Sequence, residues 1–407
     1  MSRQGGDAIL QQIKSLVTGL LIFLAVMFQS FWMPELAVGS MICPITVRAA
    51  ETDVSLELEK WLEQDALGFE DVEESLNEIS NSESFHFTDT VKGLVKGEIP
   101  LNTETLKNLA FQAIFSELQN QKNTAVQVLL LVIAAAVIMN FTDIMEKSKT
   151  SGVGFYVMYL LLFTLLINAF YGMSRMLETS LGQVIGFMKA LLPSYFAASV
   201  FASGSISGAA FYEFSFLVIM AIQWLMKYVF LPLVELYVLF GMLNHLSGDE
   251  RLSRLADLMR VFTEWSLKTM MAAVIGMQAV QSLILPAVDS VKTTTVNKVA
   301  SSVPGIGNLF GNVTEMVLGS ALLVKNAIGV AGMIVVVLIC LAPLARLAFC
   351  ALLYRAMAAI IQPVSDKRLN ACVASVSDGA GLLLKIMASV AMLFFLTIAM
   401  VTASIGG

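Results

Sequence analysis

Residues 301–346 read SSVPGIGNLFGNVTEMVLGSALLVKNAIGVAGMIVVVLICLAPLAR. The first part of this segment carries one proline and three glycines: Pro304, Gly305, Gly307 and Gly311. Proline and glycine disfavour regular helix, so the sequence predicts an irregular turn there. Two ionisable residues, Glu315 and Lys325, follow before an uninterrupted apolar run at 334–342. The segment therefore combines a helix-breaking turn, two ionisable residues in apolar surroundings and a membrane-spanning helix.

Two interpretations of this segment remain open. It is either an exposed loop followed by a surface helix, or a re-entrant element that lines a cavity within the membrane. Irregular backbone at membrane depth is tolerated only where protein or water surrounds it. Ionisable residues inside spans are candidates for function. On the second interpretation, the four helix breakers together with Glu315 and Lys325 form a packing or pathway site.

The composition indicates an all-α, polytopic integral membrane protein. Of the 407 residues, 57% are hydrophobic and 14% are charged, whereas soluble domains have about 25% charged residues. No nucleotide-binding, zinc-protease or hydrolase motif occurs, and the four cysteines and two histidines show no metal-ligand spacing. We therefore expect no enzyme activity, cofactor or metal, and no nucleic-acid partner for a chain with a net charge of −6.

The N-terminus has the features of a secretory signal peptide, predicted to comprise residues 1–49. Arg3 and Lys14 supply positive charge, residues 16–33 are apolar, and cleavage is expected after Ala49. The apolar region is longer than usual, which leaves an uncleaved first span as the alternative.

Residues 50–123 are predicted to form a small acidic, helical, extracytoplasmic segment. Between positions 51 and 100 there are 14 Asp and Glu residues against 3 Lys. Phe69, Val72 and Leu76 recur at helical spacing, and a second helix is expected at 104–119. The acidic face is either simply solvated or a docking surface for a partner.

Residues 124–407 are predicted to form the membrane domain, with about six to eight spans. Interrupted or re-entrant helices are expected near 174–212 and 301–326. Two loops rich in arginine and lysine, at 247–263 and 346–368, are expected on the cytoplasmic side. The simplest set of spans is 125–141, 153–172, 214–246, 267–288, 327–344 and 382–401.

The long apolar segment at 214–246 contains two opposite charges and a proline. Lys227 and Glu235 are eight residues apart, which is roughly 80° around an ideal helix. They either pair within the bundle or extend towards different surfaces. Pro232 predicts one bent helix or two closely spaced ones.

The motif Pro304-Gly-Ile-Gly-Asn-Leu-Phe-Gly, with Glu315, Leu318-Gly-Ser and Lys325-Asn-Ala-Ile-Gly, resembles the stage III sporulation protein AE family. Residues 86–99 resemble the segment that precedes the membrane domain in that family. The resemblance implies a multi-pass protein of the mother-cell membrane around the forespore, in a channel or transport complex needed for late forespore development. It implies as partners the other stage III A operon membrane proteins and the forespore stage II Q protein, besides the lipid bilayer. Homo-oligomerisation stays open, and a non-conducting membrane scaffold is the alternative function.

Overall fold

The computed structural model describes residues 69–79, 86–95, 150–203, 206–247, 252–300, 307–363 and 366–403, with short pieces between 111 and 134, the longest of them 125–130. Its elements are all helical: α3 (Phe69–Ile79), α4 (Phe87–Val95), α6 (Thr150–Ser203), α7 (Ile206–Leu225), a π-helix (Met226–Phe230), α8 (Leu231–Ser247), α9 (Ser253–Ala300), α10 (Gly307–Ile361) and α11 (Lys367–Ala403). The all-α prediction is therefore confirmed for these residues. The predicted signal peptide, most of the 125–141 span, and Pro304 and Gly305 lie outside them.

Among the described residues, four helical segments are long and apolar enough to cross a membrane. They are Tyr156–Tyr195, Leu217–His245, Leu323–Ile361 and Lys367–Ile398. They contain or overlap four of the expected spans, whereas the expected span at 267–288 lies partly outside the residues whose side chains are described. Six to eight spans consequently remain a prediction.

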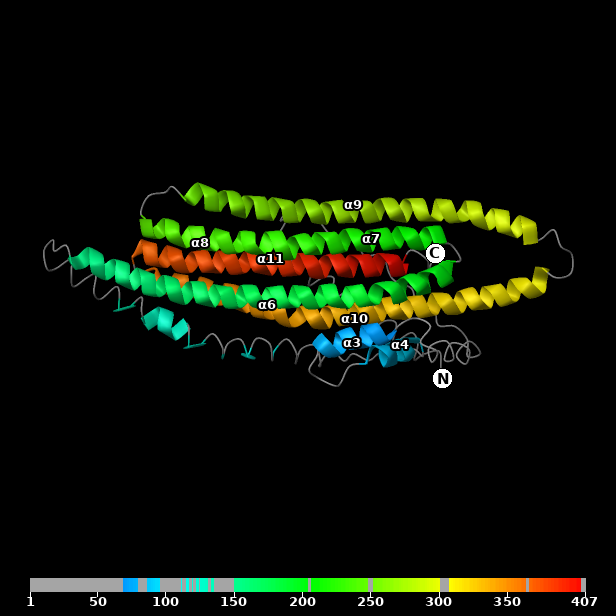
Figure 1. Ribbon diagram of the computed structural model, residues 1–407, viewed down its shortest axis with the longest axis horizontal. Helices are drawn as coiled ribbons and strands as arrows, with labels where there is room; N and C mark the ends of the chain where they lie inside the picture. The colour runs from blue at the N-terminus through cyan, green and yellow to red at the C-terminus, as the bar shows by residue number, and fades with distance from the viewer. Residues whose placement is uncertain are drawn as a thin grey trace.

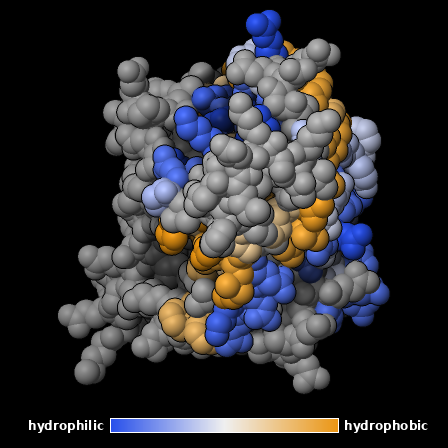
Figure 2. Space-filling view, turned by 90° about the vertical axis from the view of Figure 1, so that its left-hand side faces the viewer, coloured by the Kyte–Doolittle hydropathy of each residue, from blue (hydrophilic) through white to orange (hydrophobic). Residues whose placement is uncertain are grey.

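The long helices lie side by side in an antiparallel bundle (Figure 1). Helices α8 and α10 end, and α9 and α11 begin, at one end of the bundle, whereas α6 and α9 end, and α7 and α10 begin, towards the other. Figure 2 views the first end and shows hydrophilic and hydrophobic residues next to one another. Arg254, Lys367 and Arg368 are exposed near it. The two segments expected as positively charged loops, 247–263 and 346–368, are mainly helical: α9 begins at Ser253, and α10 continues through Arg346 and Arg355 to Ile361.

Interrupted or re-entrant helices are expected near 174–212, and α6 is continuous through the first part of this range, with α7 beginning at Ile206. Helix α6 continues for 54 residues through Pro193 and ends only at Ser203. Pro193 is exposed, so the carbonyl group that lacks its usual N–H partner lies on the outer side of the helix. The loss of one hydrogen bond is small beside the packing of the long apolar helix, which explains why the helix is not interrupted at Pro193.

Helix α10 corrects the expectation for the glycine-rich turn. It begins at Gly307 and runs unbroken for 55 residues, so Gly307, Gly311 and Glu315 all lie in regular helix. Each glycine disfavours helix by only about 1 kcal/mol. Continuity with a long apolar helix outweighs that penalty.

The expected bend at Pro232 takes the form of a π-helical turn. The backbone stays helical from α7 to α8, with Met226–Phe230 forming the π segment immediately before the proline. Pro232 has no N–H to donate to Tyr228, and its ring crowds that carbonyl. A wider turn relieves the crowding, and π turns occur where a helix accommodates such a disruption.

The core is formed where α11 meets α10, α6 and α8. Small residues allow the helices to approach closely, as in other membrane bundles. A Cβ atom at Gly379 of α11 would lie 2.2 Å from Val238 and 2.8 Å from Phe170. The hydroxyl of Ser377 also donates to the carbonyl of Ala351, 3.1 Å away on α10.

Candidate functional site

Lys325 is the most unusual side chain of the bundle. It lies on α10, inside a candidate span, and is 0% exposed. Two turns further along the helix, Gly332 lies close to α6: a Cβ atom added to this glycine would be 2.9 Å from the side chain of Leu191. Residues seven apart share a helix face, so Lys325 lies on the face of α10 that turns towards α6.

Further polar groups lie along the same contact between α6 and α10. Ser194 and Tyr195 follow Leu191 by about one turn and are only 1% and 2% exposed. On α10, the buried Oδ1 of Asn326 has no hydrogen-bond partner. We call this contact, formed by residues 191–195 and 325–332, the Lys325 seam. Among the described residues, this part of the α6–α10 contact has a buried lysine on one helix and two buried polar side chains on the other.

Lys227 and Glu235 do not pair with each other. Each meets α6 instead: Lys227 Nζ lies 3.9 Å from Glu178 Oε1, and Ser174 Oγ donates to Glu235 Oε1 at 2.5 Å. The π segment between them takes one residue more per turn than α-helix, so both face α6. They are separated along the axis by about 12 Å, however, at 1.5 Å per residue, and this distance prevents direct pairing.

A charged network between α9 and α11 escaped the sequence analysis. Glu264 Oε1 lies 2.7 Å from Lys385 Nζ and 3.6 Å from Arg260 Nε. The guanidinium of Arg260 also lies 3.8 Å from Asp378 Oδ2. Lys385 is the only ionisable residue after Asp378, and this isolation in an apolar segment was the available signal. We call these four residues the α9–α11 network.

The α9–α11 network lowers the pKa of Glu264. Partial burial by itself raises this pKa, but the hydrogen bond from Lys385 and the charges of Lys385, Arg260 and Lys268 more than offset it. A carboxyl group with a lowered pKa in the folded state stabilises the fold above its unfolded pKa. That contribution is lost as the pH falls through the folded pKa.

Replacing Glu264 with glutamine should lower the free energy of unfolding at pH 7 by about 1–2 kcal/mol. This loss lies between the losses usually caused by breaking an exposed ion pair and by breaking a buried one. Thermal unfolding in detergent measures the difference, which should shrink below the ordinary pKa of 4.5. Glu178→Gln is the matched control, because that carboxylate is half exposed and 3.9 Å from its lysine. A difference between wild type and Glu264→Gln that stays constant from pH 7 to pH 3 would contradict this assignment.

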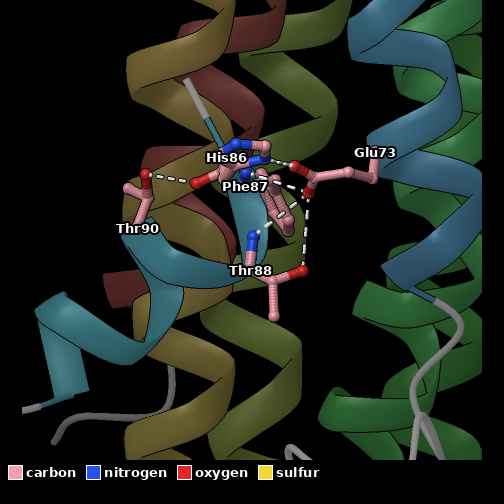
Figure 3. A network of polar contacts seen from close by, with 5 residues as sticks. All are labelled: Glu73, His86, Phe87, Thr88 and Thr90. Carbon is pink, nitrogen blue, oxygen red and sulfur yellow. Dashed lines mark hydrogen bonds and ion pairs between the residues drawn. The ribbon is translucent and has the colours of Figure 1, made fainter. Parts of the chain in front are cut away.

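The acidic N-terminal segment contributes two helices that dock on the bundle. Glu73 of α3 joins them: its Oε1 lies 2.8 Å from His86 Nδ1, and its Oε2 accepts from the backbone N–H groups of Phe87 and Thr88 at 3.0 and 3.3 Å (Figure 3). A carboxylate at a helix N-terminus satisfies free N–H groups and interacts well with the helix dipole. α3 confirms the helix predicted from Phe69, Val72 and Leu76, whereas α4 was not predicted.

The described residues offer no obvious centre for covalent or metal chemistry. No group of three or more His, Cys, Asp or Glu side chains within them is placed to hold a metal ion. Cys340, Cys350 and Cys372 are buried and have not formed disulfides. The polar groups that the fold brings together are therefore ion pairs and hydrogen bonds between helices.

Comparison with known proteins gives one consistent result. Residues 85–405 match the family described as Stage III sporulation protein AE. The Stage III sporulation protein AE of Bacillus subtilis (strain 168) is 23% identical over 299 residues, which cover 73% of this chain and 75% of that protein. No solved structure matches. The family match begins at the His86-Phe87-Thr88 segment of α4 and extends through the last helix, and the chain therefore belongs to the stage III sporulation protein AE family.

Proposed function

We propose that this chain is a membrane subunit of the sporulation channel or transport complex that links the mother cell to the forespore. The observation that carries the proposal is Lys325, a lysine with no exposed surface inside a candidate span. Ionisable residues in such segments are costly and are retained mainly where they serve a function. The α9–α11 network adds four more charged side chains to the same bundle.

The proposal includes a location and partners. The mature chain begins near Ala50, lies in the mother-cell membrane around the forespore, and works with the other stage III A operon membrane proteins and the forespore stage II Q protein. Residues 51–123 face away from the mother-cell cytoplasm. Labelling of Ser82→Cys and Ser253→Cys in cells, with the native cysteines replaced, tests this orientation. Only Ser82→Cys should react with an impermeant reagent from outside, and equal labelling of both positions would exclude the topology.

A non-conducting scaffold is the second candidate function. It is favoured by the docked α3 and α4, whose exposed side chains include the acidic residues Glu70, Asp71, Glu74 and Asp89. A fixed acidic surface suits the assembly of other subunits, whether or not the bundle itself conducts.

Ion flux through liposomes that contain the purified full-length protein distinguishes the two functions. A conducting subunit should dissipate an imposed potassium gradient at least tenfold faster than protein-free liposomes. A rate equal to that of protein-free liposomes, with the protein inserted and folded, would favour the scaffold.

A further inference from the structure

Helices α3 and α4 bridge two different long helices. α3 packs on α6, and α4 packs on α10. They contain only 11 and 9 residues, fewer than the roughly 12–15 that an isolated helix needs in water. Their helical structure therefore depends on docking to the bundle.

Apolar side chains attach both helices to the bundle. Phe69, Val72 and Leu76 of α3 and Phe87 and Val91 of α4 are all at most 6% exposed. The ring of Phe87 lies between two others, with centroids 5.7 Å from Phe69 and 6.4 Å from Phe187 on α6. Phe187 therefore marks where the pair of short helices sits on α6.

The Glu73 carboxylate holds the two short helices to each other. Besides His86 and the two backbone N–H groups, its Oε2 accepts from the hydroxyl of Thr88 at 3.4 Å. One side chain thus fixes the orientation of α4 relative to α3. Removal of this carboxylate would leave the first N–H groups of α4 without their partner.

The docking position adjoins the Lys325 seam. Ser194 follows Phe187 by seven residues, so both lie on the same face of α6, two turns apart. Ser75 of α3 also lies next to this part of α6, because its Oγ would be 3.9 Å from a Cβ at Gly186. The face of α6 that Ser75 of α3 and Phe87 of α4 contact therefore continues towards Ser194 and the seam.

The bundle itself does not need α3 and α4 to bring α6 and α10 together. Those two helices contact each other directly, down to the close approach of Leu191 and Gly332. The short helices add a second layer over an existing contact. A layer of this kind can detach without dissolving what lies beneath it.

We propose that α3 and α4 form a strap across α6 and α10 that controls access to the Lys325 seam. When the strap is docked, it covers the outer side of the seam; when Glu73 no longer binds α4, the strap detaches and this side of the seam becomes accessible. The consequence for transport rests on the proposed function, whereas the covering of the seam does not.

A disulfide lock tests the strap without removing any of its contacts. Ser75→Cys and Gly186→Cys, with the native cysteines replaced by alanine, place two thiols next to each other, because a Cβ at Gly186 would lie 3.9 Å from the Oγ of Ser75. Oxidation should lower ion flux in proteoliposomes at least tenfold, and a reductant should restore it. Equal flux in the oxidised and reduced protein would show that the strap is no gate.

Thiol labelling tests the covering of the seam independently of transport. In a cysteine-free background, Ser194→Cys should react at least tenfold faster when Glu73→Ala is added. Glu74→Ala is the matched control, because Glu74 is the exposed neighbour on the same helix. Equal reaction rates of Ser194→Cys with and without Glu73→Ala would contradict the proposal that the strap covers the seam. If wild-type liposomes show no flux, the proposed function fails, and the labelling result still decides whether the strap covers the seam.

Discussion

Replacing Gly379 with leucine is expected to abolish the folded protein in membranes. Gly379 lies where α11 meets α6 and α8, and even a Cβ there would be 2.2 Å from Val238 and 2.8 Å from Phe170. Both neighbours are buried side chains, a β-branched valine and a ring, that have little freedom to move away. A leucine therefore forces the three helices apart.

Alanine provides the graded version of this test. Gly379→Ala gains about 1 kcal/mol of helix propensity but overpacks a tight contact, which typically costs about 1–3 kcal/mol. We expect net destabilisation, measured by thermal unfolding in detergent. Gly381→Ala is the matched control, because nothing lies within 4 Å of its Cβ, and it should unfold at the same or a higher temperature. Equal behaviour of the two alanine variants would contradict the close packing of α11.

Replacing Lys325 with methionine should separate function from stability. Methionine has similar length and no charge, so it fills the same space and removes only the ammonium group. We therefore expect folded protein in the membrane together with at least a tenfold loss of late-gene reporter activity in the forespore. Membrane abundance of the variant provides the check on folding.

The control for Lys325→Met is Lys189→Met, which removes an exposed lysine from α6. It should leave reporter activity near the wild-type level. If Lys325→Met supports normal activity at normal abundance, the buried lysine is only a tolerated feature of the bundle. The Lys325 seam would then have no role in transport.

Composition and periodicity predicted the parts of the fold that depend on local patterns. The spacing of Phe69, Val72 and Leu76 located α3, and these three side chains are buried as expected. The apolar segments around 153–172, 214–246, 327–344 and 382–401 all proved helical. Such predictions succeed because one helix face must be apolar whatever it packs against.

The predictions that failed required knowledge of neighbouring helices. Gly307 and Gly311 weaken a helix locally, yet α10 continues through them, because local propensity is small beside the packing of a long helix. Lys227 and Glu235 were compared only with each other, although their partners, Glu178 and Ser174, lie on α6. Lys385 could have been singled out as an isolated charge, but its pairing with Glu264 spans 121 positions.

The great length of α10 has a mechanical consequence. Its 55 residues make a rod of about 80 Å, against a hydrocarbon layer of about 30 Å. Such a rod acts as a lever: a tilt of about 5° around one end displaces the other by about 7 Å. A small tilt of α10 about its C-terminal end would therefore move its N-terminal end, near Gly307, by more than the rise of one helical turn.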